Sequence, residues 1–285
     1  MIGAMTRAVV LGGGGVAGIA WETGVLAGLA DEGVDLTKAD LVVGTSAGSA
    51  VAAQLTSGLD LAELFRRQVD PDAQSPEIPA EFDPEKLAEI FGLGGEDTAD
   101  TVDRTELRRQ IGNAALLAET VTEQRRRDVI AARLPVHTWP SARLLIVAVD
   151  ATTGEERIFD AAGGVPLVDA VAASCAVPGI WPPVTIGASR YVDGGVRSAE
   201  NADLANGHDV VLVFQAMRVP GMDDLDAQVE TLRQQGSAVL VITADERSVE
   251  AIGTNPLDPT TREAAARAGR RQGAGVAATI ALTWS

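Results

Sequence analysis

Short apolar runs recur along the chain, and the first two end in glycines. Residues 7–11 and 41–43 are such runs; the glycine-rich stretches 12–15 and 44–48 follow them, and a helical pattern begins after each stretch. A strand, a glycine turn and a helix, repeated in this way, are typical of a parallel sheet whose strands are buried on both faces. Further apolar runs predict three more strands, at 144–149, 210–214 and 239–242. Helical spacing predicts helices at 18–32, 167–173 and 262–278.

The segment from about residue 60 to 140 interrupts this pattern. Four prolines punctuate its first part, and residues 60–106 hold 14 acidic and 4 basic side chains, a net charge of −10. Residues 107–143 hold seven arginines and three acidic side chains, and their apolar positions have helical spacing. We therefore expect a single domain over 5–285 with a helical insertion at about 60–140, the usual place for a cover over an active site. The alternative is a set of solvated helices that only pack against the core.

Composition excludes several classes of function. The 285 residues carry a net charge of −17 and are 46% hydrophobic, so the chain can bury a large core without disulfides and is repelled by nucleic-acid phosphates. The single cysteine, Cys175, and the two histidines, His137 and His208, are too few for a Cys-rich or His-rich metal centre. We expect no metal, no cofactor and no nucleic-acid partner.

The N-terminal residues do not have the pattern of an export signal. The apolar stretches 8–11 and 16–20 are separated by four glycines, and Glu22 follows them. No run reaches the roughly 18 apolar residues that a membrane span needs, so the expected location is cytoplasmic. The two lysines, Lys38 and Lys86, are isolated, which predicts at most weak peripheral contact with a membrane.

The strongest candidate for chemistry is the sequence Gly44-Thr-Ser-Ala-Gly48. It is a G-x-S-x-G pattern placed directly between a predicted strand and a predicted helix, which is the context of a nucleophile elbow. The flanking glycines leave room for a tight turn that lifts the Ser46 hydroxyl above the carboxyl edge of the sheet. The alternative is an ordinary strand-to-helix turn that contains serine.

A serine nucleophile needs a base, and the position of the histidines argues against them. His137 and His208 each precede a predicted strand, so both belong at the amino edge of the sheet, about one strand length of 17–20 Å from an elbow at the carboxyl edge. Asp193 ends a short apolar segment and is followed by Gly194 and Gly195. A pocket that partly desolvates Asp193 would make it basic enough to accept the serine proton. The alternative is that Asp-Gly-Gly only forms a turn.

Four consecutive glycines form the third candidate element. Successive backbone N–H groups in the run 12–15 can stabilise an oxyanion or bind another anion. Gly13, Gly15 and Gly18 also fit the dinucleotide pattern G-x-G-x-x-G. That pattern expects an acidic residue at the end of the second strand, whereas Asp31, Glu32 and Asp35 precede that strand, which disfavours a nucleotide site.

Taken in order, three of these motifs resemble those of the patatin-like phospholipases: the glycines Gly13, Gly14, Gly15 and Gly18, the elbow at Ser46, and the Asp193-Gly-Gly sequence. The stretch 173–183, with Trp181 in place of Phe, and Asn201 resemble two further segments of that family. The resemblance implies a three-layer α/β/α fold with a mostly parallel central sheet and hydrolysis of lipid acyl esters without a histidine.

The resemblance also implies roles for single residues. Ser46 would be the nucleophile and Asp193 the base, while the backbone amides of Gly13, Gly14, Gly15 and Ala47 would form the oxyanion hole. Gly18, Gly44, Gly48, Gly194 and Gly195 would support the motifs.

The chain departs from the family at Ala17, where the family usually carries Arg or Lys. We therefore expect a preference for neutral or single-chain acyl esters over anionic phospholipid bilayers. The arginines 108–109 and 125–127 offer the opposite possibility, a basic rim on the insertion. The main hypothesis is a serine acyl hydrolase acting on a lipid or small acyl ester; the alternatives are a dinucleotide-binding protein and a non-catalytic protein of the same fold.

Overall fold

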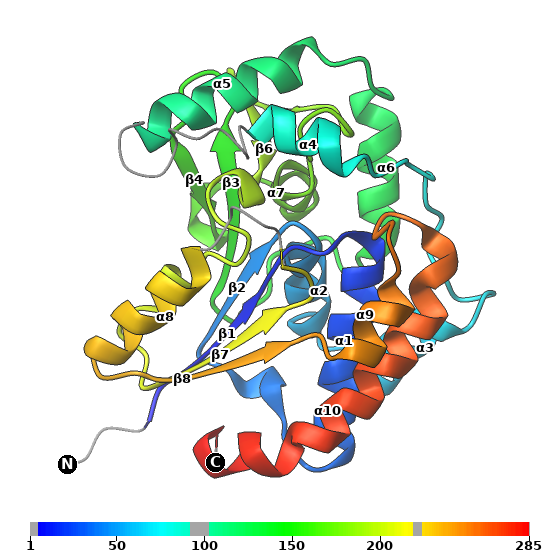
Figure 1. Cartoon of the computed structure of the whole chain (residues 1–285), viewed down its shortest axis with the longest axis vertical. Coiled ribbons are helices and arrows are strands. Elements are labelled where there is room, and N and C mark those ends of the chain that lie inside the picture. The colour runs from blue at the N-terminus through cyan, green and yellow to red at the C-terminus, as the bar shows by residue number, and fades with distance from the viewer. Residues whose placement is uncertain (1–4, 92–102, 219–223, 285) are drawn as a thin grey trace.

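The computed structural model describes residues 5–91, 103–218 and 224–284 (Figure 1). Among these residues, eight strands form one sheet in the order β5-β6-β3-β2-β1-β7-β8, with β4 paired to β3. Five strands are mutually parallel: β1 (Arg7–Leu11), β2 (Leu41–Thr45), β3 (Leu144–Asp150), β7 (Val210–Gln215) and β8 (Ala238–Thr243). These are the five strands that the sequence predicts, so the mostly parallel α/β fold is confirmed.

Three antiparallel strands extend the sheet beyond the prediction. They are β4 (Glu156–Phe159), β5 (Val184–Ile186) and β6 (Ser189–Asp193). Each is short and partly exposed, so none produces the long apolar run by which the buried parallel strands are recognised.

Helices cover both faces of the sheet. The helices are α1 (Gly15–Asp31), α2 (Ala47–Leu55), α3 (Leu61–Val69), α4 (Pro84–Phe91), α5 (Arg104–Leu117), α6 (Glu123–Arg133), α7 (Leu167–Ser174), α8 (Asp224–Gln234), α9 (Glu246–Ile252) and α10 (Arg262–Trp284). In Figure 1, α8 lies on one side of the parallel strands, and α1, α9 and α10 lie on the other. The described parts of the region 60–140 form α3 to α6, which agrees with the predicted helical character of this region.

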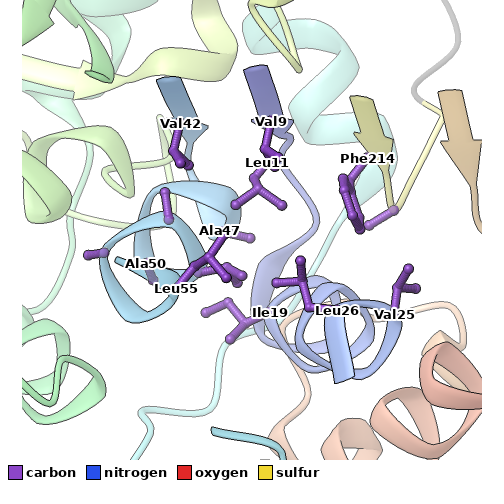
Figure 2. Packing of buried hydrophobic residues seen from close by; sticks show 14 of the residues in the cluster. Val9, Leu11, Ile19, Val25, Leu26, Val42, Ala47, Ala50, Leu55 and Phe214 are labelled. Atoms are coloured by element: carbon purple, nitrogen blue, oxygen red, sulfur yellow. The ribbon is translucent and has the colours of Figure 1, made fainter. Parts of the chain in front are cut away.

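The alternation of side chains along β1 separates two cores. Val9 and Leu11 face α1 and α2, where they pack in a cluster with Leu26 of α1 and Phe214 of β7 (Figure 2). Ala8 and Val10 point to the opposite face and join the core beneath α8. Because every residue of β1 after Arg7 is buried, the loop that follows this strand starts from a fixed position at the carboxyl edge of the sheet.

Candidate active site

The elbow around Ser46 has the strand-turn-helix geometry that its sequence predicts. β2 ends at Thr45, α2 begins at Ala47, and Ser46 between them has φ 52° and ψ −120°, a left-handed conformation that is rare outside glycine. A Cβ atom at Gly48 would lie 2.1 Å from the carbonyl oxygen of Leu11, and one at Gly44 would lie 2.6 Å from the Cα atom of Ser49. Only glycine therefore lets the elbow pack this closely on β1 and α2.

β3 aligns Ser46 with Asp193. β2 pairs with residues 144–147 of β3, and β6 pairs with residues 148–150. β4 pairs with residues 146–149, overlapping both, so β2 and β6 must share the opposite edge of β3. Thr45 lies opposite Val147 and Asp193 lies opposite Ala148, so the ends of β2 and β6 meet on neighbouring residues of β3.

Asp193 is a buried carboxyl with one satisfied oxygen. Its side chain accepts a hydrogen bond at Oδ1 from the N–H of Gly195, at 2.7 Å, and only 3% of the residue is exposed. The other oxygen, Oδ2, is buried and has no aligned hydrogen-bond partner among the described residues. Gly194 brings the chain close to β3, because a Cβ atom there would lie 2.4 Å from the carbonyl oxygen of Val147.

The environment of Asp193 makes it a better base than an ordinary aspartate. Burial raises the pKa of its carboxyl from 3.8 to about 7. The Gly195 N–H, the Ser46 hydroxyl and the positive charge of Arg126 each lower this pKa and offset part of the effect of burial. A carboxylate with a pKa near 7 is matched to proton transfer at neutral pH.

The glycine run supplies unpaired backbone donors beside Ser46. The N–H of Gly13 donates to the carbonyl of Ala199 at 2.9 Å. In the described part of the chain, the N–H groups of Gly14, Gly15 and Ala47 make no hydrogen bond. Gly15 and Ala47 begin α1 and α2, so these donors lie at two helix N-termini, where the helix dipoles favour negative charge. The N–H of Gly13 is therefore not free to bind an oxyanion. Among the described residues, the N–H groups of the other three that the resemblance implies are free.

A cavity of about 390 Å³ opens over these groups. Ser46 and Asp193 line it together with Gly13, Gly14, Gly15 and Gly195. The remaining walls are mainly apolar and include Phe82, Leu87, Ala88, Phe91, Val177, Ile180, Met217 and Leu257. Three of these side chains come from α4, so part of the region 60–140 lines the cavity. Arg218 is the only cationic residue among the described residues that line it.

Both histidines lie away from the cavity. His208 precedes β7, at the amino edge of the parallel strands, and its Nδ1 lies 2.9 Å from the carbonyl oxygen of Ala205. His137 lies between α6 and β3, and its Nε2 lies 2.9 Å from the carbonyl oxygen of Ala131. Neither ring lines the cavity that contains Ser46.

The fold changes two expectations about charge, one at Ala17 and one at the arginines 125–127. Ala17 is fully buried in the core between α1 and the sheet, so its side chain does not face the cavity, and the missing cation there says nothing direct about substrate charge. The arginine run is only partly exposed: Arg126 is 4% exposed, Arg127 donates to Asp169 at 2.5 Å, and Arg125 is exposed. The burial of Arg126 is not visible in the sequence, because consecutive arginines ordinarily indicate a solvated face.

The acidic residues with the spacing of a dinucleotide site lie at the end of α1 that is far from the glycine run. Gly15 begins this helix and Asp31 ends it, which separates them by about 25 Å at 1.5 Å per residue. Asp31 is bound by Arg270, and Asp35 accepts from Thr37. Gly18 instead packs near Ala47 and Ala216 and holds α1 close to the elbow.

The described residues contain no candidate for a metal site or a membrane span. Within residues 5–91, 103–218 and 224–284, no group of three or more His, Cys, Asp or Glu side chains is arranged to hold a metal ion. No helix in these ranges is both long enough and apolar enough to cross a membrane.

Comparison with known proteins agrees with the motif pattern. Residues 9–206 match the family described as patatin-like phospholipase. No curated protein sequence matches the chain.

Solved structures with a similar fold include three bacterial and human proteins. VipD from Legionella pneumophila is 15% identical with a TM-score of 0.48, and the alignment covers 97% of this chain and 67% of VipD. The type III effector protein ExoU of Pseudomonas aeruginosa is 19% identical with a TM-score of 0.43, covering 97% of this chain and 53% of ExoU. Human GIVD cytosolic phospholipase A2 is 12% identical with a TM-score of 0.45, covering 98% and 58%. The chain thus spans about half to two thirds of the length of these proteins.

Proposed function

Since the chain belongs to the patatin-like phospholipase family, we propose that it is a serine acyl-ester hydrolase that uses Ser46 as nucleophile and Asp193 as base. The observation that carries this proposal is the meeting of β2 and β6 on neighbouring residues of β3, which brings a strained serine and a buried, half-satisfied carboxyl to one apolar cavity. No histidine is required, because burial already gives Asp193 a pKa of about 7.

The first half of the reaction forms an acyl-enzyme. Ser46 Oγ attacks the ester carbonyl carbon while its proton passes to Asp193 Oδ2, the carboxyl oxygen without an aligned partner. The N–H groups of Gly14, Gly15 and Ala47 are the donors available to the oxyanion of the tetrahedral intermediate. When the intermediate collapses, the alkoxide leaves and takes the proton from Asp193.

The second half regenerates the enzyme. Asp193 accepts a proton from water, the hydroxide attacks the acyl carbon, and the second tetrahedral intermediate is stabilised by the same three amides. Its collapse releases the carboxylic acid, and the proton on Asp193 returns to Ser46 Oγ. The two half-reactions together consume one ester and one water and give one acid and one alcohol.

The cavity supports an acyl chain as the group recognised. Its walls from α4, together with Val177 and Ile180, are apolar, so a fatty acyl chain is desolvated there without leaving a polar group unpaired. The net charge of −17 repels anionic bilayers, so we propose single-chain lipid esters, presented as monomers, as the substrate class. Leu87 and Phe91 of α4 would contact the chain, which gives the region 60–140 a role as a cover.

A fluorophosphonate probe combined with a substrate panel tests this function. The probe should label wild-type protein at Ser46, and the panel should contain p-nitrophenyl esters, monoacylglycerols, lysophospholipids and diacyl phospholipids. Ser46→Ala and Asp193→Asn should each lower kcat/KM at least about a thousandfold, and the double variant should be little worse, because nucleophile and base act as one unit.

Asp150→Asn is the matched control, because Asp150 is a carboxylate at the end of a strand in the same sheet but does not line the cavity. It should keep wild-type activity. An Asp193→Asn variant with a tenth of wild-type activity would contradict the dyad, and a folded wild-type protein that neither reacts with the probe nor hydrolyses any ester would be a non-catalytic member of the family.

A further inference from the structure

Three consecutive residues at the end of α7, residues 174–176, contact the backbones of Ser46 and Asp193. Ser174 Oγ accepts the N–H of Ser46 at 3.0 Å, and the Cys175 thiol donates to the carbonyl of Ser46 at 3.1 Å. The next carbonyl, of Ala176, accepts the N–H of Asp193 at 3.0 Å. One short segment therefore holds the backbones of both side chains proposed to react.

The Ser46 backbone requires such support. Its φ of 52° is a conformation that costs a non-glycine residue about 1–3 kcal/mol and persists only where the surroundings fix it. Its carbonyl has two further donors, the N–H of Ser49 at 3.0 Å and the Ser49 hydroxyl at 2.6 Å. Its N–H has one acceptor, Ser174 Oγ, so the orientation of the peptide group before Ser46 depends on that oxygen.

Ser174 is well placed to impose an orientation. It is the last residue of α7 and is fully buried, and the residues before it on this helix pack in the main core. Its hydroxyl oxygen therefore has little freedom to move. Loss of this oxygen would leave the partly buried N–H of Ser46 without its acceptor, which is more costly than the net gain from one hydrogen bond.

We propose that Ser174 is a positioning residue: by accepting the Ser46 N–H, its hydroxyl fixes the elbow so that Ser46 Oγ faces Asp193 Oδ2. This inference rests on the proposed hydrolase function. Ala176 does the same for Asp193 through its carbonyl, so the segment 174–176 sets the separation between nucleophile and base. The stretch 173–183, which resembles a segment of the family, would thus hold the nucleophile and the base in position.

Ser174→Ala tests the proposal. We expect kcat to fall about 10- to 100-fold, as loss of a partly buried hydrogen bond that aligns the nucleophile implies, with KM changed less than twofold because Ser174 does not line the cavity. The rate of labelling by the fluorophosphonate should fall in parallel, and the pH midpoint of kcat/KM should rise, because a misdirected Ser46 hydroxyl no longer lowers the pKa of Asp193. Ser174→Thr retains the oxygen and should restore most of the lost rate.

Ser248→Ala is the matched control, because Ser248 is equally buried but bonds Gln272, away from the cavity. It should reproduce any loss of stability without the loss of kcat. Amide exchange at Ser46 gives a readout that does not need turnover: protection should drop in Ser174→Ala and not in Ser248→Ala.

The outcomes separate the two proposals. If wild-type protein hydrolyses esters but Ser174→Ala keeps kcat within twofold and keeps the protection of the Ser46 amide, the positioning role is wrong and the hydrolase function stands. If the loss of protection appears without any ester hydrolysis by wild-type protein, the hydrogen bond is real but the positioning role fails together with the proposed function.

Discussion

The side-chain amide of Asn201 donates a hydrogen bond to the hydroxyl of Thr45, 3.0 Å away, and so connects the loop after Asp193 to the residue before Ser46. The same nitrogen lies 3.3 Å from the carbonyl oxygen of Gly194. Arg197 donates to the amide oxygen of Asn201 at 2.6 Å, which fixes which end of the amide points to Thr45. Asn201 is fully buried with φ 57°, a conformation that asparagine tolerates better than most residues.

Asn201→Asp should therefore lower both stability and activity. The substitution keeps the size and tolerates the same backbone conformation, but it replaces a donor by an acceptor that faces the oxygens of Thr45 and Gly194. We expect a Tm lower by several degrees and a reduced kcat. Asn206→Asp, at an exposed position in the same loop, is the control for the added charge; equal Tm values for the two variants would contradict the tether.

The pH dependence of ester hydrolysis should report the ionisation of Asp193. Only the carboxylate accepts the serine proton, and its pKa is raised to about 7, so kcat/KM should rise as pH increases through about 7 and level off above it. A profile measured from pH 5 to 9 with a soluble ester checks this. A midpoint near pH 4 would mean that Asp193 is not desolvated when the enzyme works.

Removing the charge of Arg126 should move that midpoint. The guanidinium lies 3.9 Å from the centre of the Trp181 ring, is 4% exposed, and stabilises the carboxylate form of Asp193. Arg126→Met therefore raises the pKa of Asp193, and the rising limb of kcat/KM should shift to higher pH while the plateau is retained. Arg125→Met removes the exposed neighbouring charge and should leave the midpoint unchanged; the same shift in both variants would point to net charge as the cause.

Asp193→Asn should stabilise the fold, and the gain should be larger at neutral and high pH than at acid pH. The carboxyl has a pKa of about 7 in the folded protein and an ordinary value of 3.8, so ionisation favours the unfolded chain and stability is lost as pH rises from about 4 to about 7. The amide keeps the acceptor for Gly195 without this penalty. The Tm advantage of the variant should be small at pH 4.5 and larger at pH 8; a constant difference would contradict the raised pKa.

The two histidines should be dispensable. His137 and His208 both lie away from the cavity, so replacing both by Gln should leave kcat within about threefold of wild type, since no proton transfer passes through them. A hundredfold loss in the single variant His208→Gln would instead indicate a Ser-His mechanism.

The sequence by itself determined the features that depend on local pattern. Fully buried parallel strands need continuous apolar runs, and the close packing at Gly44 and Gly48 on either side of Ser46 needs glycine, so the five parallel strands and the elbow at Ser46 could be predicted. His208 could be assigned to the amino edge of the sheet in the same way, because β7 begins two residues after it, at Val210.

Tertiary structure decided what depends on residues far apart in the chain. Thr45 and Asp193 meet because β2 and β6 pair with consecutive stretches of β3, a register that no local pattern in either strand specifies. Burial, which only packing creates, raised the pKa of Asp193 and placed Arg126 inside rather than on a basic surface. The N–H of Gly13 likewise donates to the carbonyl of Ala199. The position of Ala199 beside Gly13 follows from the fold and not from the glycine motif.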